Sequence, residues 1–159
     1  MKNFITALLT IFLVACVPTK EMAVYVNEPI VGPKEIALVG NRAPWVIDIE
    51  KRLRSEGISI KRFASLGEAT EKISETRSET KATATTRVIL VLDGFAPNTG
   101  MTRCFGGGYN FNYISAEIID AQNNETIAVY ANSGYSEGCQ PLSGTIFGDI
   151  SGMVLNAFK

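Results

Sequence analysis

The chain of 159 residues contains no histidine. Histidine is the usual general acid or base near neutral pH and the commonest ligand of transition metals, so its absence argues against most hydrolases and against zinc sites. The two signs of charge nearly balance, with 15 basic and 16 acidic side chains spread along the chain. Because nucleic acid requires a dense basic face, we expect no nucleic-acid partner.

A long apolar run is also missing. The most apolar stretch covers 4–17 and stops before Pro18, whereas a helix that crosses a bilayer needs about 20 apolar residues. Lys2 precedes the run and small residues end it, which is the pattern of a secretory signal peptide. We interpret residues 1–15 as the signal peptide of an exported protein. A membrane-spanning helix and a signal peptide cleaved at another position are the alternatives.

The apolar run ends in Leu13, Val14, Ala15 and Cys16. This tetrapeptide resembles the lipobox of bacterial lipoproteins, in which cleavage before the cysteine is coupled to attachment of a diacylglyceryl group to its sulfur and a fatty acid such as palmitate to its new amino terminus. The resemblance implies that Cys16 is lipidated and anchors the protein to a membrane. Many Gram-negative lipoproteins that stay at the inner membrane carry Asp after the cysteine. Val17 instead implies the outer membrane, with the domain facing the periplasm.

Cysteine is scarce, and two remain once Cys16 carries lipid. In an oxidising compartment Cys104 and Cys139 are expected to form a disulfide. The segments 109–120 and 126–132 are predicted to be the arms of a hairpin, and this pairing places the two cysteines within about three residues of facing each other beyond its open end. A redox-active or metal-binding pair is the alternative, but the sequence has no Cys-x-x-Cys spacing.

The mature chain has the length of one domain. Residues 16–34 are interpreted as the lipidated cysteine and a tether, because this segment lacks helical periodicity, and 24–26 could add an edge strand. The folded body is expected to be a single periplasmic domain over 35–159. The prolines that favour a tether are Pro18, Pro29 and Pro33.

The body begins with an apolar run over 36–39, which predicts a strand covered on both faces. A helix is expected from Pro44, with Asn41 or Ala43 near its cap and Gly57 at its end. Alternation then predicts a strand over 58–63. The side chains expected to face the core from the helix are Trp45, Val46, Ile49 and Leu53.

Ser65 and Glu68 form a capping-box pattern, which predicts a second helix from Leu66 through Ile73, followed by a polar loop over 74–86. The most apolar strand, 87–92, is expected at the centre of the sheet. A last helix follows Pro141. Its apolar stripe consists of Ile146, Ile150, Met153, Val154, Ala157 and Phe158.

The expected order is therefore β-α-β-α-β-β-β-α. Two βαβ units with right-handed crossovers give a parallel core, which the carboxy-terminal hairpin extends into a mixed sheet with helices packed on it, so the predicted fold class is α/β. This order, with its local hairpin at 115–120 and 126–130, resembles the periplasmic α/β domain of the curli-secretion lipoprotein, the lipoprotein activators of penicillin-binding proteins and the amino-terminal domain of the Tol-system propeller protein. Small uncharacterised bacterial lipoproteins share it.

The resemblance implies a non-enzymatic binding or scaffold domain that holds a protein partner in the periplasm. The sequence agrees, because no nucleophile, acid–base pair or metal-ligand cluster has a recognisable spacing, and we expect no cofactor and no metal. Most carboxylates are expected to be solvated. The serines that lack a catalytic partner in the sequence are Ser133, Ser136 and Ser143, and the dispersed carboxylates are Asp48, Glu50, Asp120 and Asp149.

A small-ligand receptor or enzyme that uses the loops between Asp93 and Gly108 is the alternative function. Ligands of open α/β sheets collect at the carboxyl ends of the strands, and Asp93 and Asn98 follow the predicted central strand. Gly106, Gly107 and Gly108 complete the candidate binding loop. They lack the Lys-Ser/Thr and the helix of a phosphate-binding loop, so we interpret them as a turn beside the disulfide.

The aromatic residues Tyr109, Phe111 and Tyr113 alternate along one strand face. Such a stripe is typical of core packing, and Asn110 and Asn112 would then occupy the opposite, exposed face.

Overall fold

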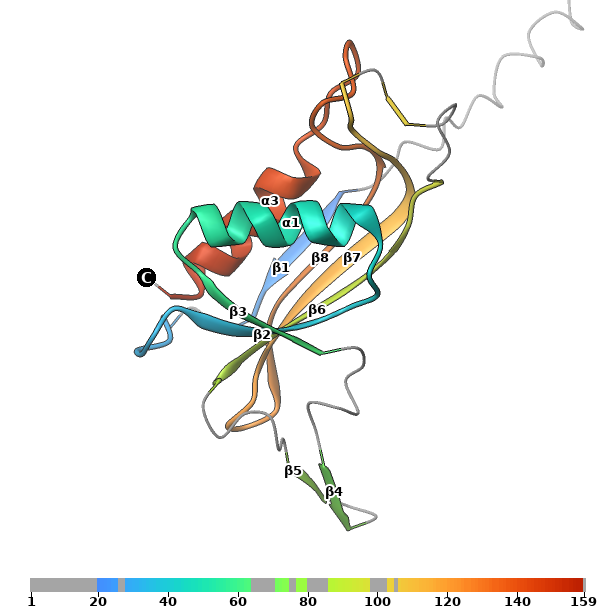
Figure 1. Ribbon diagram of the computed structural model, residues 1–159. Coiled ribbons are helices and arrows are strands. Elements are labelled where there is room, and N and C mark those ends of the chain that lie inside the picture. The colour runs from blue at the N-terminus through green and yellow to red at the C-terminus, as the bar shows by residue number, and fades with distance from the viewer. Residues whose placement is uncertain are drawn as a thin grey trace, which may run out of the picture.

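The most apolar strand lies inside the sheet. Figure 1 shows the computed structural model, in which β6 (Val88–Phe95) runs between β2 (Glu35–Val39) and β7 (Asn110–Asp120). The structure describes residues 20–25, 28–63, 71–74, 77–79, 86–97, 103, 104 and 106–158. The predicted signal peptide and Cys16 lie outside these residues, and no helix within them is long and apolar enough to cross a bilayer.

The main sheet has six strands in the order β1-β8-β7-β6-β2-β3. Its parallel part consists of β2 between β3 (Ser59–Phe63) and β6, and the remaining neighbours pair antiparallel through β7, β8 (Glu125–Tyr135) and β1 (Glu21–Val24). Two helices pack on one face of this sheet (Figure 1). The predicted α/β class with a mixed sheet is therefore confirmed.

The hairpin of β7 and β8 forms as predicted, with register shifts at two points. Ser115 faces Ala131, and Asp120 faces Glu125 across the turn. Asn124 adopts a φ of 58° in that turn, a left-handed conformation that Asn tolerates better than most residues. The pairing matters for the site because it sets where the open end of the hairpin lies.

The first helix, α1 (Pro44–Ser55), begins where the sequence predicts. Asn41 accepts a hydrogen bond from the Ala43 backbone N–H through Oδ1 at 3.0 Å, and Pro44 occupies the first turn, where a missing N–H costs nothing. Gly57 follows the helix with a φ of +86°, which a residue with a side chain rarely adopts. The buried stripe is Trp45, Val46, Ile49 and Leu53.

The last helix, α3 (Ile146–Asn156), also buries the predicted stripe. Its apolar side chains meet those of α1 and the facing strands in one core. Burying an aliphatic side chain of this size contributes about 1.5–3 kcal/mol relative to leaving it in water. The stripe residues in this core are Ile146, Ile150, Met153, Val154, Ala157 and Phe158.

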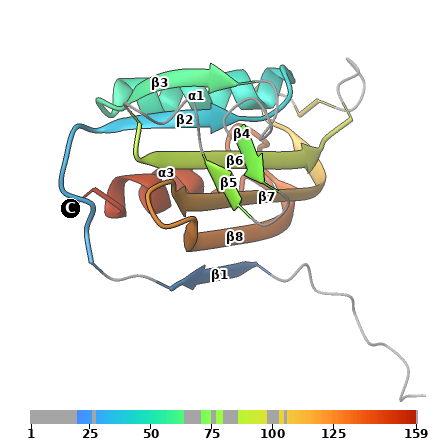
Figure 2. The ribbon, with the colours of Figure 1, turned by 90° about the horizontal axis from the view of Figure 1, so that it is seen from below.

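The other face of the sheet carries a smaller apolar cluster. Ala37, Val39 and Ile89 form its buried part, with partly buried neighbours at Phe63 and Val91. Figure 2 shows this face, with β1 at one edge of the sheet and β3 at the other. No described helix lies on it.

The predicted second helix is wrong over the residues that the structure describes. β4 (Glu71–Ser74) and β5 (Arg77–Glu79) pair antiparallel as a separate two-stranded sheet, and the rest of the predicted helix, 66–70, lies outside the described residues. From 71 to 79 the sequence offers a single large apolar side chain, Ile73. A helix there would have no stripe to bury, and isolated helices of this length are marginal in water.

The amino-terminal tether is shorter than predicted. β1 lies at 21–24 rather than 24–26 and pairs with β8, and the Tyr25 N–H donates to the Ile127 carbonyl at 2.8 Å. Ile30 is buried and donates its N–H to the Ala157 carbonyl at 2.8 Å. Both points fix the segment to the domain. Most of β1 is exposed, so its sequence carries no burial pattern that would reveal a strand.

Candidate functional site

The open end of the β7–β8 hairpin is closed by a disulfide between Cys104 and Cys139, as predicted. Their Cα atoms are 4.8 Å apart, inside the roughly 4.4–6.8 Å range that a disulfide requires. We call the disulfide together with 106–109 and 136–145 the disulfide end. It joins the entry into β7 to the segment that leads into α3.

The glycines of the candidate loop pack against the second half of the disulfide end. A Cβ on Gly108 would lie 2.5 Å from both the Cys139 sulfur and the Glu137 carbonyl oxygen, and one on Gly106 would lie 2.6 Å from the Gly138 carbonyl oxygen. Only glycine allows backbones to approach this closely. The contacts support the interpretation of these residues as a turn beside the disulfide.

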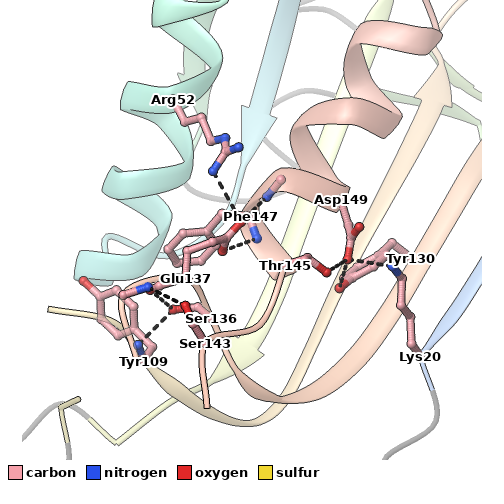
Figure 3. Close-up of polar contacts among 12 residues, drawn as sticks. Lys20, Arg52, Tyr109, Tyr130, Ser136, Glu137, Ser143, Thr145, Phe147 and Asp149 are labelled. Carbon is pink, nitrogen blue, oxygen red and sulfur yellow. Dashed lines mark hydrogen bonds and ion pairs between the residues drawn. The ribbon is translucent and has the colours of Figure 1, made fainter. Parts of the chain in front are cut away.

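Two of the serines hold backbone groups. Ser136 is fully buried, accepts a hydrogen bond from the Tyr109 N–H at 2.9 Å and donates one to the Glu137 carbonyl at 3.0 Å. Ser143 accepts a hydrogen bond from the Gly138 N–H at 3.0 Å (Figure 3). Both hydroxyl groups therefore tie the disulfide end together, which is a structural task.

Tyr109 is a buried polar centre of this end. Its hydroxyl group donates to Asp48 Oδ2 at 2.7 Å, and the Arg103 guanidinium lies 4.5 Å from its ring centroid. Burial raises the pKa of Tyr109 to about 12, and the bond to Asp48 and the charge of Asp48 act in the same direction. The phenol stays protonated at neutral pH and serves as a hydrogen-bond donor. Aromatic neighbours surround it, with Phe147 at 5.9 Å and Phe111 at 6.0 Å between ring centroids.

Glu137 caps α3 from outside the helix (Figure 3). Its Oε2 accepts from the Phe147 N–H at 3.0 Å and its Oε1 from the Gly148 N–H at 2.6 Å, and Arg52 of α1 approaches Oε1 at 3.3 Å. A helix amino terminus attracts anions because its N–H groups lack partners. The chain thus fills its own anion site. The sequence could not show this cap, since local capping patterns involve residues nearer the helix.

Asp149 collects a second set of contacts on α3. Its Oδ2 accepts from Thr145 Oγ1 at 2.8 Å and Tyr130 Oη at 3.3 Å, and it pairs with Lys20 Nζ at 2.8 Å. Burial raises the pKa of Tyr130 to about 12. Through Lys20, this carboxylate attaches the first described residue of the chain to the body of the domain (Figure 3).

Two other carboxylates expected to be solvated have ionic partners. Asp120 is only 5% exposed and binds Arg87 at 2.7 Å and the Gln122 N–H at 2.9 Å. Burial alone would raise the pKa of Asp120, but these hydrogen bonds and the Arg87 charge hold it below its usual value. Glu50 pairs with Arg54 at 2.9 Å and with a further arginine, Arg62, at 3.0 Å. Those expectations were wrong because cross-strand and helix–strand partners cannot be read from local spacing.

The predicted binding loop is only partly a loop. Asp93 lies within β6, which continues to Phe95, and its exposed side chain occupies the sheet face without helices, opposite Ser115. Asn98 lies outside the described residues. The structure therefore places Asp93 on a strand and the three glycines in the disulfide end. A small cavity of about 50 Å³ lies at the opposite end of β6, where Ile30, Arg87 and Val88 are among its lining residues.

The aromatic stripe is interrupted by a bulge in β7. Tyr109 and Phe111 are buried as predicted, but the register shifts between Phe111 and Ile114, so Ile114 takes the next core position. Tyr113 is exposed on the opposite face, where it pairs with Phe95 of β6. A β-bulge changes the face of the residues around it, which strict alternation cannot anticipate.

Within the described part of the chain, no group of three Cys, Asp or Glu side chains is arranged to hold a metal ion.

The similarity of this chain to known proteins is a similarity of fold. No family model and no curated protein matches the sequence. The solved PelC dodecamer from Paraburkholderia phytofirmans is similar in fold, with a TM-score of 0.50 and 13% identity over 89% of this chain and 98% of that chain. A single-residue variant of that dodecamer has a TM-score of 0.49 at the same identity and coverage.

Proposed function

We propose that this protein is a lipid-anchored, non-enzymatic scaffold domain of the bacterial cell envelope, held at the periplasmic face of the outer membrane through Cys16, where it binds a protein partner. The observation that carries the proposal is the short distance between anchor and fold. Lys20 already pairs with Asp149, and Glu21 already pairs with Ala131 of β8. A lipidated Cys16 would therefore mount a rigid domain directly on the membrane.

The polar groups of the disulfide end and of the adjoining parts of β8 and α3 favour a scaffold over an enzyme. Glu137 and Ser136 bind backbone N–H groups, and Asp149 binds two hydroxyl groups and a lysine. Tyr109 and Tyr130, with pKa values of about 12, stay neutral. A catalytic acid or base needs a pKa near the working pH and access to a substrate. These groups instead stabilise the fold around the hairpin.

The partner is expected in the same compartment. The PelC neighbour is a dodecamer, so a further copy of this chain is one of the partners that an experiment must be able to detect. Crosslinking in intact envelopes, followed by solubilisation and mass spectrometry through an affinity tag at the carboxyl terminus, would identify either kind of partner. We expect a defined crosslinked protein species, and the same preparation with crosslinker omitted is the control.

The opposite result would favour a receptor or an enzyme. In that case the envelopes would yield no crosslinked protein, while the purified domain would show a saturable thermal shift with a small molecule that Asp93→Ala abolishes. Asp93 is a suitable position because its side chain is exposed and its removal leaves no buried group without a partner. That combination of results would replace the scaffold proposal.

A further inference from the structure

Exposed large apolar side chains gather at one end of the sheet. β6 ends there, β7 begins there, and β8 leads there into the loop before α3 (Figure 1). Scattered exposed apolar residues are normal in soluble proteins, but a group on adjoining elements marks an interaction surface. The side chains are Phe95 at 53% exposure, Tyr113 at 49%, Tyr135 at 37% and Leu142 at 60%. We call these four residues the aromatic end.

Three members share one face of the sheet. Gly94 pairs with Ile114, which is in the helix-covered core, so the adjacent pair Phe95 and Tyr113 points to the other face. Tyr135 pairs with Asn110, next to the core residue Phe111, and lies on that other face too. The three aromatic side chains thus follow one another across β6, β7 and β8 on the face that Figure 2 displays.

The chain from Cys16 reaches the domain at the same end. Glu21 pairs with Ala131, so Lys20 lies at the level of Asn132 on β8. Tyr135 is three residues further along, which is about 10 Å in a strand. The chain between Cys16 and Lys20 spans at most about 14 Å when fully extended. A lipid on Cys16 therefore leaves little room between the aromatic end and the bilayer.

We propose that the aromatic end rests on the bilayer to which Cys16 is attached, so that its side chains lie among the lipid headgroups. This inference rests on the lipid anchor of the proposed function. Tyrosine suits the position because its ring is apolar while its hydroxyl group stays hydrated, and aromatic side chains are enriched at membrane interfaces. The contact fixes the orientation of the domain and turns the carboxyl end of α3 and the loop at 31–34 away from the membrane.

Another exposed tyrosine lies far from this surface. Tyr25 is 64% exposed, but its N–H bonds to Ile127, eight residues from Tyr135 along β8 and about 26 Å away. A flat membrane that touches Tyr135 cannot also touch Tyr25 when β8 stands steeply on it. Tyr25 is therefore a control of the same residue type, at least as accessible as Tyr113 and remote from the proposed contact.

The test attaches the chain covalently to a membrane through Cys16. The chain from Cys16 onward contains every described element of the fold, and Cys104 and Cys139 are bonded to each other, so Cys16 is its free thiol. It is joined to a maleimide phospholipid in vesicles of phosphatidylethanolamine and phosphatidylglycerol that also carry lipids spin-labelled near the headgroup. The variants are Tyr113→Trp and Tyr25→Trp. The natural Trp45 is 2% exposed and gives both the same background.

We expect the spin label to quench the fluorescence of Tyr113→Trp at least about threefold more than that of Tyr25→Trp, since only the former would lie at headgroup depth. Equal quenching of the two variants would overturn the proposal. It would also be overturned if, without vesicles, Tyr113→Trp became better protected from acrylamide quenching as the protein concentration increased, because the surface would then bind a second copy of the chain. Unchanged thermal unfolding of both variants verifies the fold. Because the maleimide supplies the anchor, failure here leaves the natural lipidation of Cys16 a separate question.

Discussion

Glu137 accepts hydrogen bonds from the first N–H groups of α3, a role that an N-cap residue directly before the helix usually fills. The Glu137→Ala change should lower the free energy of unfolding by about 2 kcal/mol, because the N–H groups of Phe147 and Gly148 lose a charged acceptor in a partly buried place. Chemical denaturation at neutral pH measures this. Glu56→Ala, at the exposed end of α1, is the control and should change stability by a few tenths of that amount.

A substitution of Arg52 tests which partner of Glu137 contributes most to the stability of this contact. If the carboxylate acts mainly through the helix amides, Arg52→Ala should cost much less than Glu137→Ala, since the ion pair at 3.3 Å is partly exposed. A double-mutant cycle separates the two contributions. Equal losses in both single variants would show that the arginine, not the helix terminus, is the principal partner.

Asp120 gives the stability of the protein a component that depends on pH. Its pKa is lower in the folded state than its usual value of 3.8 because Arg87 and the Gln122 N–H bind the charged form. The stabilisation is therefore present above the pKa of the unfolded chain and is lost as the pH falls through the folded-state pKa. Asp120→Asn should be less stable than the wild type by about 2 kcal/mol at pH 7.

The difference should shrink when the two proteins are compared in urea at progressively lower pH, below the usual pKa of the carboxyl group. Asp93→Asn removes an exposed carboxylate from β6 and serves as the control. A gap between wild type and Asp120→Asn that stays constant down to strongly acidic pH would contradict the assignment.

We predict that the location of the protein depends on Cys16. Attachment of acyl chains holds a protein at a membrane because each buried methylene contributes about 0.8 kcal/mol, and two or three chains hold far more firmly than one. Cys16→Ser should abolish metabolic labelling with a fatty-acid analogue and leave the precursor uncleaved. Label retained in that variant would refute the anchor, and Cys104→Ser, which should keep the label, is the control.

At the scale of elements, the disulfide should stabilise the two segments of the disulfide end more than the rest of the domain. It closes a loop of 35 residues, for which the chain-entropy model gives about 4 kcal/mol. Reduction should accelerate amide exchange first at 106–108 and 140–144, while β6 at 88–92, hydrogen-bonded on both sides, keeps its protection until global unfolding. Exchange measured by mass spectrometry, with and without reductant, tests this order.

Elements with a strong internal pattern could be predicted from the sequence. The apolar spacing of α1 and α3 and the central position of β6 came from the chain itself, and the hairpin register was close enough to place the Cys104–Cys139 bridge. The failures share another cause. β1 lies on an exposed edge and β4 is short and polar, so neither carries a burial pattern, and the exposure of Tyr113 depends on a bulge. The structure of such segments depends on their pairing with other strands, which local periodicity does not predict.

The site was predictable to the extent that it depends on covalent chemistry. The disulfide and the glycine turn beside it follow from residue type and spacing. Glu137 and Asp149 were not identified as important because their partners, Arg52 and Lys20, come from elements far away in the sequence. The prediction that Asp93 follows its strand is wrong because β6 continues through Gly94. The absence of a side chain at Gly94 allows a close approach of β7, with the Cα of Ile114 3.2 Å from where a Cβ of Gly94 would lie.

At the scale of the whole molecule, the helices cover one face of the sheet and leave different surfaces for different contacts. The aromatic end lies near the attachment point of the chain, while β3 forms the far edge of the sheet, with Lys61 and Arg62 along it. In a domain oriented by its membrane contact, the β3 edge would face sideways, in a direction parallel to the membrane plane. A protein partner is therefore expected to approach from the side, and crosslinks should concentrate on β3 and α1.

The pairing of β1 with β8 also has a mechanical consequence. Force that enters through a lipid anchor meets the Lys20–Asp149 ion pair and the four pairs of the β1 ladder before it reaches the core. If these yield, the segment between Lys20 and Ile30, whose N–H is bonded to Ala157, leaves the sheet; its contour length is about 35 Å, part of which β1 already spans in its extended form. Pulling between the Cys16 thiol and the carboxyl terminus should show the release of β1 as a separate step before the core opens, and Asp149→Asn should lower the force of that step while the force that opens the core stays the same. If Cys16 carries a lipid, β1 would then act as a releasable clamp, which holds the domain close to its membrane at rest and lengthens the link between them under load.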